Sequence, residues 1–469
     1  MEWFVDGDYW WSRLLFQRVL AAVYLVAFLT AARQFRALIG THGMLPAPAH
    51  LRVTSWRSAP GLFRLHYSDR LFALCSWSGV VLSAALVAGA ADRLPLPVAM
   101  VWWAVLWLLY LSIVNIGQTW YAFGWESLLL ETGFLAVFLG NERTGPPVLI
   151  LFLLRWVLFR VEFGAGLIKL RGDRCWRDLT CLYYHHETQP MPGPLSWFFH
   201  RLPRPLHRME VAANHFAQLV LPVLLFTPQP VATAAAAGIA ITQLWLVLSG
   251  NFAWLNWLTI ALALTALDGS LLEPAPKPLP TAPLWYEITV IAVTAFLLVL
   301  SYRPALNLLS RRQQMNRSYD SLHLVNAYGA FGSVSRVRHE VVMEGTTEAT
   351  LRPGTQWRAY GFRGKPTDVH RLPRQFAPYH LRLDWMMWFA ALSPAYARPW
   401  FGPFVERLLA GDRDTVRLLG HDPFPAAPPA WVRARLYRYR LTTRAERRAT
   451  GAWWHRDFVR EYLPPTRLD

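Results

Sequence analysis

Six charged side chains lie within two consecutive apolar stretches, where an unpaired charge is costly. The first stretch, TWYAFGWESLLLETGF, contains Glu126 and Glu131. The second, LLRWVLFRVEFGAGLIKL, contains the other four: Arg155, Arg160, Glu162 and Lys169. Charges at bilayer depth face a bundle interior or a polar cavity and pair with one another. The two stretches therefore predict a polar cluster inside a helix bundle.

Three acids balance three bases in this cluster, which favours mutual pairing between neighbouring antiparallel helices. Our specific hypothesis is that Glu126 or Glu131 forms a bridge to Arg155 or Arg160. The interpretation we favour is a buried pair that fixes the register of the two helices. A substrate or proton site is one alternative, and snorkelling of the long side chains to the membrane interface is another.

Two cysteines and four histidines lie in the segment that follows. Cys175 and Cys181 are six residues apart, a spacing that fits neither a CxxC redox motif nor a usual zinc knuckle. They form a small-loop disulfide if their side of the membrane is oxidising and remain thiols if it is reducing. The third cysteine, Cys75, is interpreted as a small apolar residue of a membrane helix.

The histidines are His185, His186, His200 and His207. The run HHET is not the HExxH pattern of zinc proteases, and no carboxylate stands at a fixed spacing to complete a metal site. We therefore expect hydrogen-bonded or solvated histidines, no metal and no cofactor. The chain also lacks a GxSxG elbow, a Walker loop and a dinucleotide fingerprint, so no catalytic residue is assigned and a non-enzyme is favoured.

The elements that position these residues are long apolar helices. Hydrophobic residues make up 54% and charged residues 16% of the 469 residues, against about 25% charged in typical soluble domains. A helix needs about 20 apolar residues to cross a bilayer. We expect seven to nine transmembrane helices, chosen from candidates at 17–38, 71–91, 96–115, 123–140, 147–170, 211–227, 230–249, 252–268 and 285–306.

The expected organisation is a transmembrane domain over 1–310 and an extramembrane domain over 311–469. Two loops of the first part, 39–70 and 171–210, are long and rich in Pro, Arg and aromatic residues. With nine spans both loops fall on the same side as the C-terminal domain. We expect them to form one extramembrane body with it.

Beyond residue 315 the pattern changes to short Val-, Tyr- and Thr-rich segments separated by Gly, which is typical of antiparallel strands. Residues 380–392 and 399–420 have helical patterns instead. The fold class is therefore a polytopic α-helical membrane protein with a C-terminal α+β domain.

The formal net charge of +17 raises nucleic acid as a partner, but no nucleic-acid module is present and the charge is spread. The densest basic run alternates Arg with apolar residues and predicts a half-buried strand with one cationic face. We favour a solvated sheet edge there, with a face for anionic lipid or an acidic partner as the alternative. Its residues are Arg433, Arg435, Arg438 and Arg440.

The Arg count alone places the long loops and the C-terminal domain in the cytoplasm, by the positive-inside rule. Long folded loops cross membranes largely regardless of charge, however. Orientation is therefore left open by the charge pattern.

Several stretches resemble the lipase maturation factor family along nearly the whole chain. In the membrane part they are YWWSRLLFQRVLAAVYLVAFLTAARQFRALIGTHGMLPAP, NIGQTWYAFGWESLLLETGFLAVFLG and RVEFGAGLIKLRGDRCWRDLTCLYYHHETQPMPGPLSWFFH. In the C-terminal part they are SYDSLHLVNAYGAFGSV, WRAYGFRGKP, APYHLRLDWMMWFAAL and RARLYRYRLT. The membrane half is also similar to the superfamily that includes vitamin K-dependent carboxylases.

The resemblance implies a chaperone-like factor in the lipid bilayer that helps an exported client, such as a lipase, to fold or assemble. Animal members reside in the endoplasmic reticulum membrane with the C-terminal domain in the lumen. The composition here suggests a bacterium, so the plasma membrane and an extracytoplasmic C-terminal domain are expected. The carboxylase relationship implies the alternative, a membrane enzyme or lipid handler that uses the Glu/Arg cluster.

Overall fold

The computed structural model describes residues 2–269 and 281–468. Up to residue 310 the regular elements of the described residues are helices, as the long apolar runs predict. The α-helices there are α1 (Trp10–Leu38), α2 (Ala47–Val53), α3 (Asp69–Val87), α4 (Leu96–Ile116), α5 (Gly124–Ala136), α6 (Val148–Arg171), α7 (Arg174–Arg177), α8 (Leu182–Thr188), α9 (Ser196–Phe199), α10 (Arg204–Leu219), α11 (Leu221–Leu224), α12 (Val231–Ser249), α13 (Leu255–Leu264), α14 (Leu284–Leu300) and α15 (Tyr302–Leu309). The short 3₁₀-helices are η1 (Glu2–Phe4), η2 (Gly7–Tyr9), η3 (Leu62–Arg64) and η4 (Gln118–Tyr121).

The C-terminal part alternates strands and short helices. Its strands are β1 (Arg317–Ser318), β2 (Asn326–Ala327), β3 (Arg338–Thr346), β4 (Arg358–Ala359), β5 (Trp431–Leu441) and β6 (Trp454–Thr466). Its helices are α16 (Arg382–Leu392), α17 (Pro394–Ala397), α18 (Phe401–Leu409), α19 (Arg413–Val416) and α20 (Arg444–Thr450).

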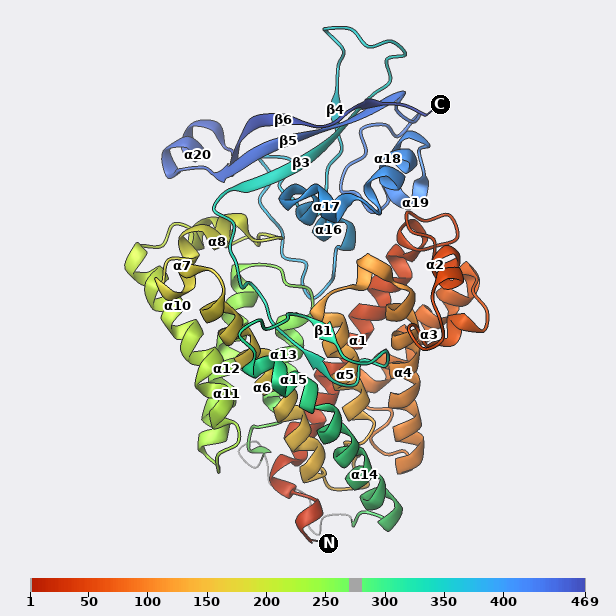
Figure 1. Cartoon of the computed structure of the whole chain (residues 1–469), viewed down its shortest axis with the longest axis vertical. Helices are drawn as coiled ribbons and strands as arrows, with labels where there is room; N and C mark the ends of the chain where they lie inside the picture. Colours follow the sequence, from red (N-terminus) through yellow and green to blue (C-terminus); the bar gives the residue numbers. More distant parts are fainter. Residues whose placement is uncertain (1, 270–280, 469) are drawn as a thin grey trace.

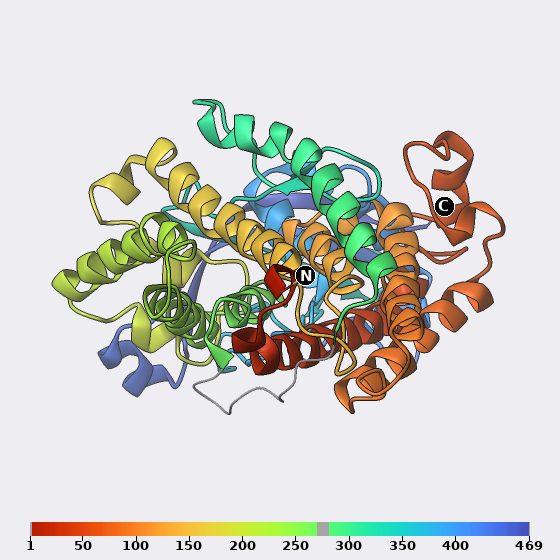
Figure 2. The ribbon, with the colours of Figure 1, turned by 90° about the horizontal axis from the view of Figure 1, so that it is seen from below.

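The long helices form a bundle in which the chain runs back and forth between two ends (Figures 1 and 2). At the end near the N-terminus, Asn141 Nδ2 donates to the Ala91 carbonyl at 3.0 Å, and Gln229 Nε2 donates to the Tyr9 hydroxyl at 2.8 Å. At the other end, Asn251 Nδ2 donates to the Arg374 carbonyl at 3.0 Å. This second end carries the C-terminal sheet, and we call it the sheet end.

Five helical segments in the described residues are long and apolar enough to cross a bilayer. They are Gly7–Leu38, Asp69–Val87, Leu96–Ile116, Val231–Ser249 and Leu284–Leu309. Large apolar side chains on their outer faces are exposed, for example Val81 at 66% and Ile241 at 68%. The expected count of seven to nine spans is not confirmed. The apolar runs at 123–140 and 252–268 form helices of only 13 and 10 residues, α5 and α13.

The C-terminal sheet lies across the sheet end of the bundle (Figure 1). Its strand order is β4-β3-β5-β6, and every neighbouring pair is antiparallel. The arginine-rich strand β5 is therefore an interior strand, and the expectation that it forms a sheet edge is wrong. Because β6 pairs with β5 along its length, β6 is the edge. Helix α16 packs against β3 with Trp385, Met386 and Met387 buried.

Residues 311–336 do not belong to this sheet but pass along the bundle before β3 begins. The two-residue strands β1 and β2 pair with each other, and β2 lies against α5 and α6. Asn326 is fully buried there. The helical half and the C-terminal part are thus interleaved around this segment.

The long loop at 171–210 is folded into α7, α8 and α9 and contacts the sheet directly. Arg338 of β3 donates to the carbonyl of Glu187 at 3.1 Å, and Trp197 Nε1 donates to the carbonyl of Thr442 at 2.9 Å. The other long loop, 39–70, contains α2 and lies at the same end of the bundle (Figure 1). Both loops share the end that carries the sheet.

Close packing of α1 against α3 generates the first prediction. Gly79 on α3 faces the ring of Phe28 on α1, and a Cβ built on Gly79 overlaps that ring. Small residues allow such close approach of membrane helices. We expect Gly79→Ala to lower the free energy of unfolding by about 1–3 kcal/mol through overpacking, seen as a lower melting temperature in detergent. Gly402→Ala is the control, because a Cβ at Gly402 has nothing within 4 Å, and an equal loss in both variants would contradict the prediction.

Candidate functional site

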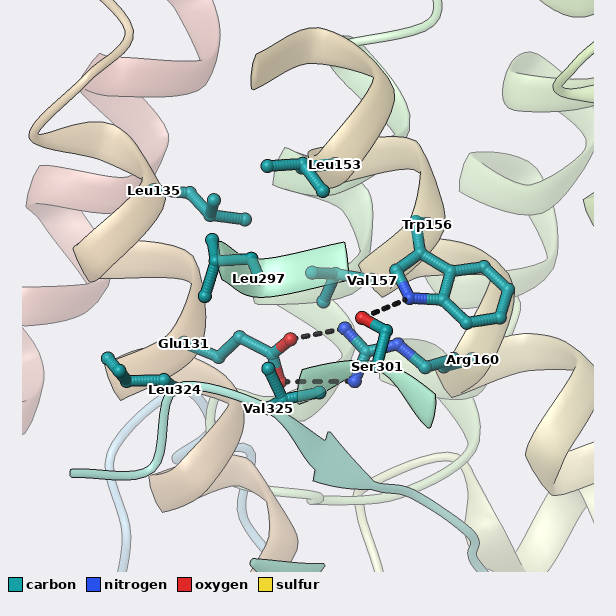
Figure 3. Close-up of a pocket in the computed structure, with 10 residues that line it drawn as sticks. All are labelled: Glu131, Leu135, Leu153, Trp156, Val157, Arg160, Leu297, Ser301, Leu324 and Val325. Carbon is teal, nitrogen blue, oxygen red and sulfur yellow. Dashed lines mark hydrogen bonds and ion pairs between the residues drawn. The ribbon is translucent and has the colours of Figure 1, made fainter. Parts of the chain in front are cut away.

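Glu131 of α5 lies in a buried network that joins α6 to the segment carrying β2. Its carboxylate pairs with the guanidinium of Arg160, as drawn in Figure 3. The same carboxylate accepts hydrogen bonds from the Tyr328 hydroxyl at 2.6 Å and from Asn326 Nδ2 at 2.9 Å. Arg160 also donates to the Asn326 carbonyl at 2.7 Å. Glu131 and Arg160 are both 2% exposed, so this is a buried ion pair whose carboxylate accepts several hydrogen bonds.

The cavity beside this pair is small. Figure 3 shows its walls, in which the Glu131–Arg160 pair lies among apolar side chains. Its volume is about 10 Å³, enough for about one water molecule. A ligand pocket normally measures about 300 Å³ or more. This cavity therefore holds no metabolite in the described conformation.

Glu126, one and a half turns earlier on α5, pairs with the C-terminal part of the chain. Arg382 Nη1 donates to Glu126 Oε1 at 2.7 Å and to the carbonyl of Trp120 at 2.6 Å. The Tyr110 hydroxyl donates to the other carboxylate oxygen. The guanidinium of Arg382 lies over the ring of Tyr121, 3.5 Å from its centroid. Of the two acids in the bridge hypothesis, Glu131 is therefore the one that pairs with Arg160, whereas Glu126 pairs with Arg382.

His380 lies beside this second pair, with Nδ1 3.7 Å from Glu126 Oε1. Burial among Phe123, Trp125 and Trp385, together with the charge of Arg382, lowers the pKa of His380 to about 4. The neutral imidazole therefore favours the folded state above about pH 6.5. That contribution is lost as the pH falls towards 4.

The other members of the predicted cluster lie apart from these two pairs. Arg155 stacks on Tyr9, with Cζ 4.6 Å from the ring centroid, near the N-terminal end of the bundle. Glu162 accepts a hydrogen bond from Gln243 at 2.6 Å. Lys169 donates to Gln218 at 2.6 Å. The six charges thus form several local networks and no single cluster.

The structure joins Cys175 and Cys181 in a disulfide at the sheet end of the bundle. Val334 and Trp176 pack against it. Nearby, the Arg336 guanidinium binds Asp173 at 2.8 Å and lowers the pKa of that carboxyl to about 2. Cys75 is a buried free cysteine on α3.

The four arginines of the candidate basic face are mostly engaged by neighbours. Arg433 binds Glu344 at 2.7 Å, and Arg440 binds Glu446 at 2.6 Å. Arg435 stacks on Phe458, with Cζ 4.2 Å from the ring centroid. Arg438 is exposed. Two of the four charges are therefore neutralised within the sheet region.

Two of the four histidines meet a carboxylate that sequence reasoning missed. His186, His207 and Glu210 place one ligand atom each within 4.8 Å of one another. The HxxE spacing of His207 and Glu210 could have indicated this cluster, because residues three apart lie on the same face of a helix. Asn326, Tyr328 and Arg382 were also missed, since they belong to segments far from α5 in the chain.

The Glu131–Arg160 pair generates the second prediction. Arg160→Met leaves the Glu131 carboxylate buried beside neutral partners only, which costs about 3–5 kcal/mol. We expect a large loss of folded protein in detergent, measured by thermal melting and monodispersity. Arg171→Met on the same helix removes an exposed guanidinium and is expected to cost less than about 1 kcal/mol. Equal stability of the two variants would exclude a structural role for the pair.

Comparison with known proteins places both parts of the chain in one family. Residues 11–274 match the lipase maturation factor transmembrane domain, and residues 324–464 match the lipase maturation factor C-terminal domain. No solved structure matches the chain significantly.

Relatives match over almost the whole length. Lipase maturation factor 1 of Bos taurus is 40% identical over 98% of this chain and 89% of the relative. Lipase maturation factor 1 of Mus musculus is 37% identical over 99% of this chain and 88% of the relative. Lipase maturation factor 2 of Gallus gallus is 30% identical over 96% and 81%. The chain therefore belongs to the lipase maturation factor family.

Proposed function

We propose that this protein is a membrane-embedded maturation factor that helps exported lipase-like proteins to fold or assemble. Its relatives are named lipase maturation factors 1 and 2 and match it over nearly the full chain. The observation that carries the proposal is the closed state of the polar networks on α5. A site with paired charges and room for about one water supports a structural role and disfavours the membrane enzyme.

The surface we assign to the client is the outer edge of β6. This strand has 13 residues, and most of its side chains are exposed. A long exposed edge has free backbone groups that pair with an extended segment of another chain. Phe458 and Val459 are exposed at 51% and 45% beside this edge. Pro464 and Pro465 lack N–H donors, so pairing would use the earlier part of the strand.

The sheet end is proposed to face an extracytoplasmic compartment, across the plasma membrane if the host is bacterial. The support is the Cys175–Cys181 disulfide at this end, because disulfides persist in oxidising compartments. The arginines of this end lie in long folded segments, whose charge has little influence on orientation.

We further propose that α6 crosses the bilayer although its charges exclude it from the five apolar spans. It has 24 residues, and its Arg160 and Glu162 are buried and hydrogen-bonded. The shorter α5, the α10–α11 pair and α13 run between the same two ends and would bring the total within the expected seven to nine. The proposed division at 1–310 and 311–469 then separates most of the bilayer part from the extracytoplasmic body. The loops 39–70 and 171–210 would join that body, and residues 311–336 would stay beside the bundle.

The third prediction tests orientation with a membrane-impermeant thiol reagent on intact cells. Cys75 is buried and the other two cysteines form a disulfide, so the background is low. We expect Gly354→Cys, in an open exposed loop between β3 and β4, to be labelled. Arg93→Cys, at the opposite end and 91% exposed, should react only after lysis. The reverse pattern would place the sheet in the cytoplasm.

The fourth prediction tests the client surface. In a host that lacks its own copy, Val459→Glu is expected to reduce the yield of active exported lipase several-fold and the amount crosslinked to this protein. The charge would oppose docking on the β6 edge while the exposed position leaves the fold intact. Val53→Glu, at an 83% exposed residue of α2, is the matched control. Full lipase yield with Val459→Glu would exclude this edge, and full yield without the protein would exclude the function.

A further inference from the structure

A second polar cluster lies between α8 and α10, outside the networks of α5. His186 comes from α8, and His207 and Glu210 come from successive turns of α10. His186 Nε2 is 3.9 Å from Glu210 Oε2, and His207 Nδ1 is 3.6 Å from the same oxygen. These separations are too long for hydrogen bonds, which reach about 3.2 Å between N and O. The three groups face one another without direct bonding.

The cluster is largely buried, and five of its polar atoms have no hydrogen-bond partner in the described residues. His186 and His207 are 1% and 2% exposed. Both ring nitrogens of both histidines and Oε2 of Glu210 are buried without a hydrogen bond in the described residues. A buried polar group without a partner costs about 1–3 kcal/mol. One ligand atom from each of the three residues lies within 4.8 Å of the other two, which indicates that a further group belongs between them.

The surroundings orient the ligand atoms towards one another. Trp245 Nε1 donates to Glu210 Oε1 at 2.5 Å, which leaves Oε2 turned to the histidines. Phe199 packs beside the His186 ring, with the ring centroids 5.4 Å apart. A hydrogen bond that fixes a ligating carboxylate and an apolar wall around the ligands are both features of metal sites.

We propose that His186, His207 and Glu210 bind one divalent cation of the zinc class. Two imidazoles and one carboxylate are a zinc ligand set, and nitrogen ligands disfavour Mg²⁺ and Ca²⁺. Atoms bound to one Zn²⁺ at about 2.0–2.1 Å lie about 3.3 Å apart in a tetrahedron. The two distances to Glu210 Oε2 are within about 0.6 Å of that value, and all three ligand atoms lie within 4.8 Å of one another. Side-chain rotations that bring the two imidazoles about 1–2 Å closer together would close the site. Three protein ligands leave one position for water or another donor.

The position of the site gives the ion a structural role. Helix α8 continues directly into the sheet contact, where the Glu187 carboxylate accepts a hydrogen bond from the Leu441 N–H of β5 at 2.8 Å. The Cys181 end of the same helix carries the disulfide. A cation between His186 and α10 would thus fix a helix of the 171–210 loop that contacts both the bundle and the sheet.

The test uses the full chain, purified in detergent, stripped with a chelator and then titrated with Zn²⁺ or Co²⁺ alone. We expect about one Zn²⁺ per chain by elemental analysis and a higher melting temperature on loading. Co²⁺ should give the intense visible absorption of a tetrahedral site. His207→Gln and Glu210→Gln keep the side-chain volume similar and are expected to lower affinity at least tenfold and to abolish the Co²⁺ spectrum.

His42→Ala is the control, because His42 is exposed and lies far along the chain in the other long loop. It should bind metal as the unaltered chain does. Absence of bound Zn²⁺ and of the Co²⁺ spectrum in the loaded unaltered chain would overturn the proposal. So would unchanged affinity in both cluster variants. The unaltered chain supplies this result even where a variant fails to fold.

Discussion

The demand that a buried carboxylate be paired determines how the two halves of this chain fit together. Glu126 and Glu131 are five residues apart on α5, and both are almost completely buried. Each receives a guanidinium and further hydrogen bonds, and in each case a group from beyond residue 320 takes part. Arg382 comes from the first turn of α16, and Asn326 comes from β2. Removing either carboxylate's partner would leave an uncompensated charge in a largely apolar surrounding.

This constraint explains why the C-terminal part is not an independent domain resting on a bundle. The segment with β1 and β2 lies against α5 and α6. The first turn of α16 contacts the first turn of α5 through Arg382 and Glu126. The sheet is also attached at a second place. There Arg338 of β3 and Trp197 of α9 form hydrogen bonds between the sheet region and the 171–210 loop. The sheet is therefore tied at two separate places on the bundle, so the exposed β6 edge has a defined orientation relative to the bundle.

Local patterns in the sequence predicted the helical class and the α+β part, and they limited the contacts between groups close in the chain to a few alternatives. Pairing of Glu131 with Arg160 was one of the bridges left open, and a disulfide between Cys175 and Cys181 was one of two states left open. The partner of Glu126 is 256 residues away, and no period or spacing links the two. Helix ends were equally hard to predict, because apolar composition continues through Val137 and beyond although α5 stops at Ala136. Strand β5 is interior because β6 pairs with its outer side. The mostly polar sequence of β6 does not predict a strand there.

The pairing of Glu126 with Arg382 also has a consequence for the order of events during synthesis. Helix α5 leaves the ribosome about 250 residues before its cationic partner, so the nascent bundle carries a carboxylate that has no counter-charge. Until residue 382 has been synthesised, burial of the unpaired Glu126 carboxylate costs free energy. We therefore expect α5 to stay at the membrane surface or to enter the bundle as the neutral acid. Pairing with Arg382 of α16 removes this cost and allows the bundle to close. Closure of the membrane part around Glu126 therefore depends on a residue that is synthesised 256 positions later in the chain.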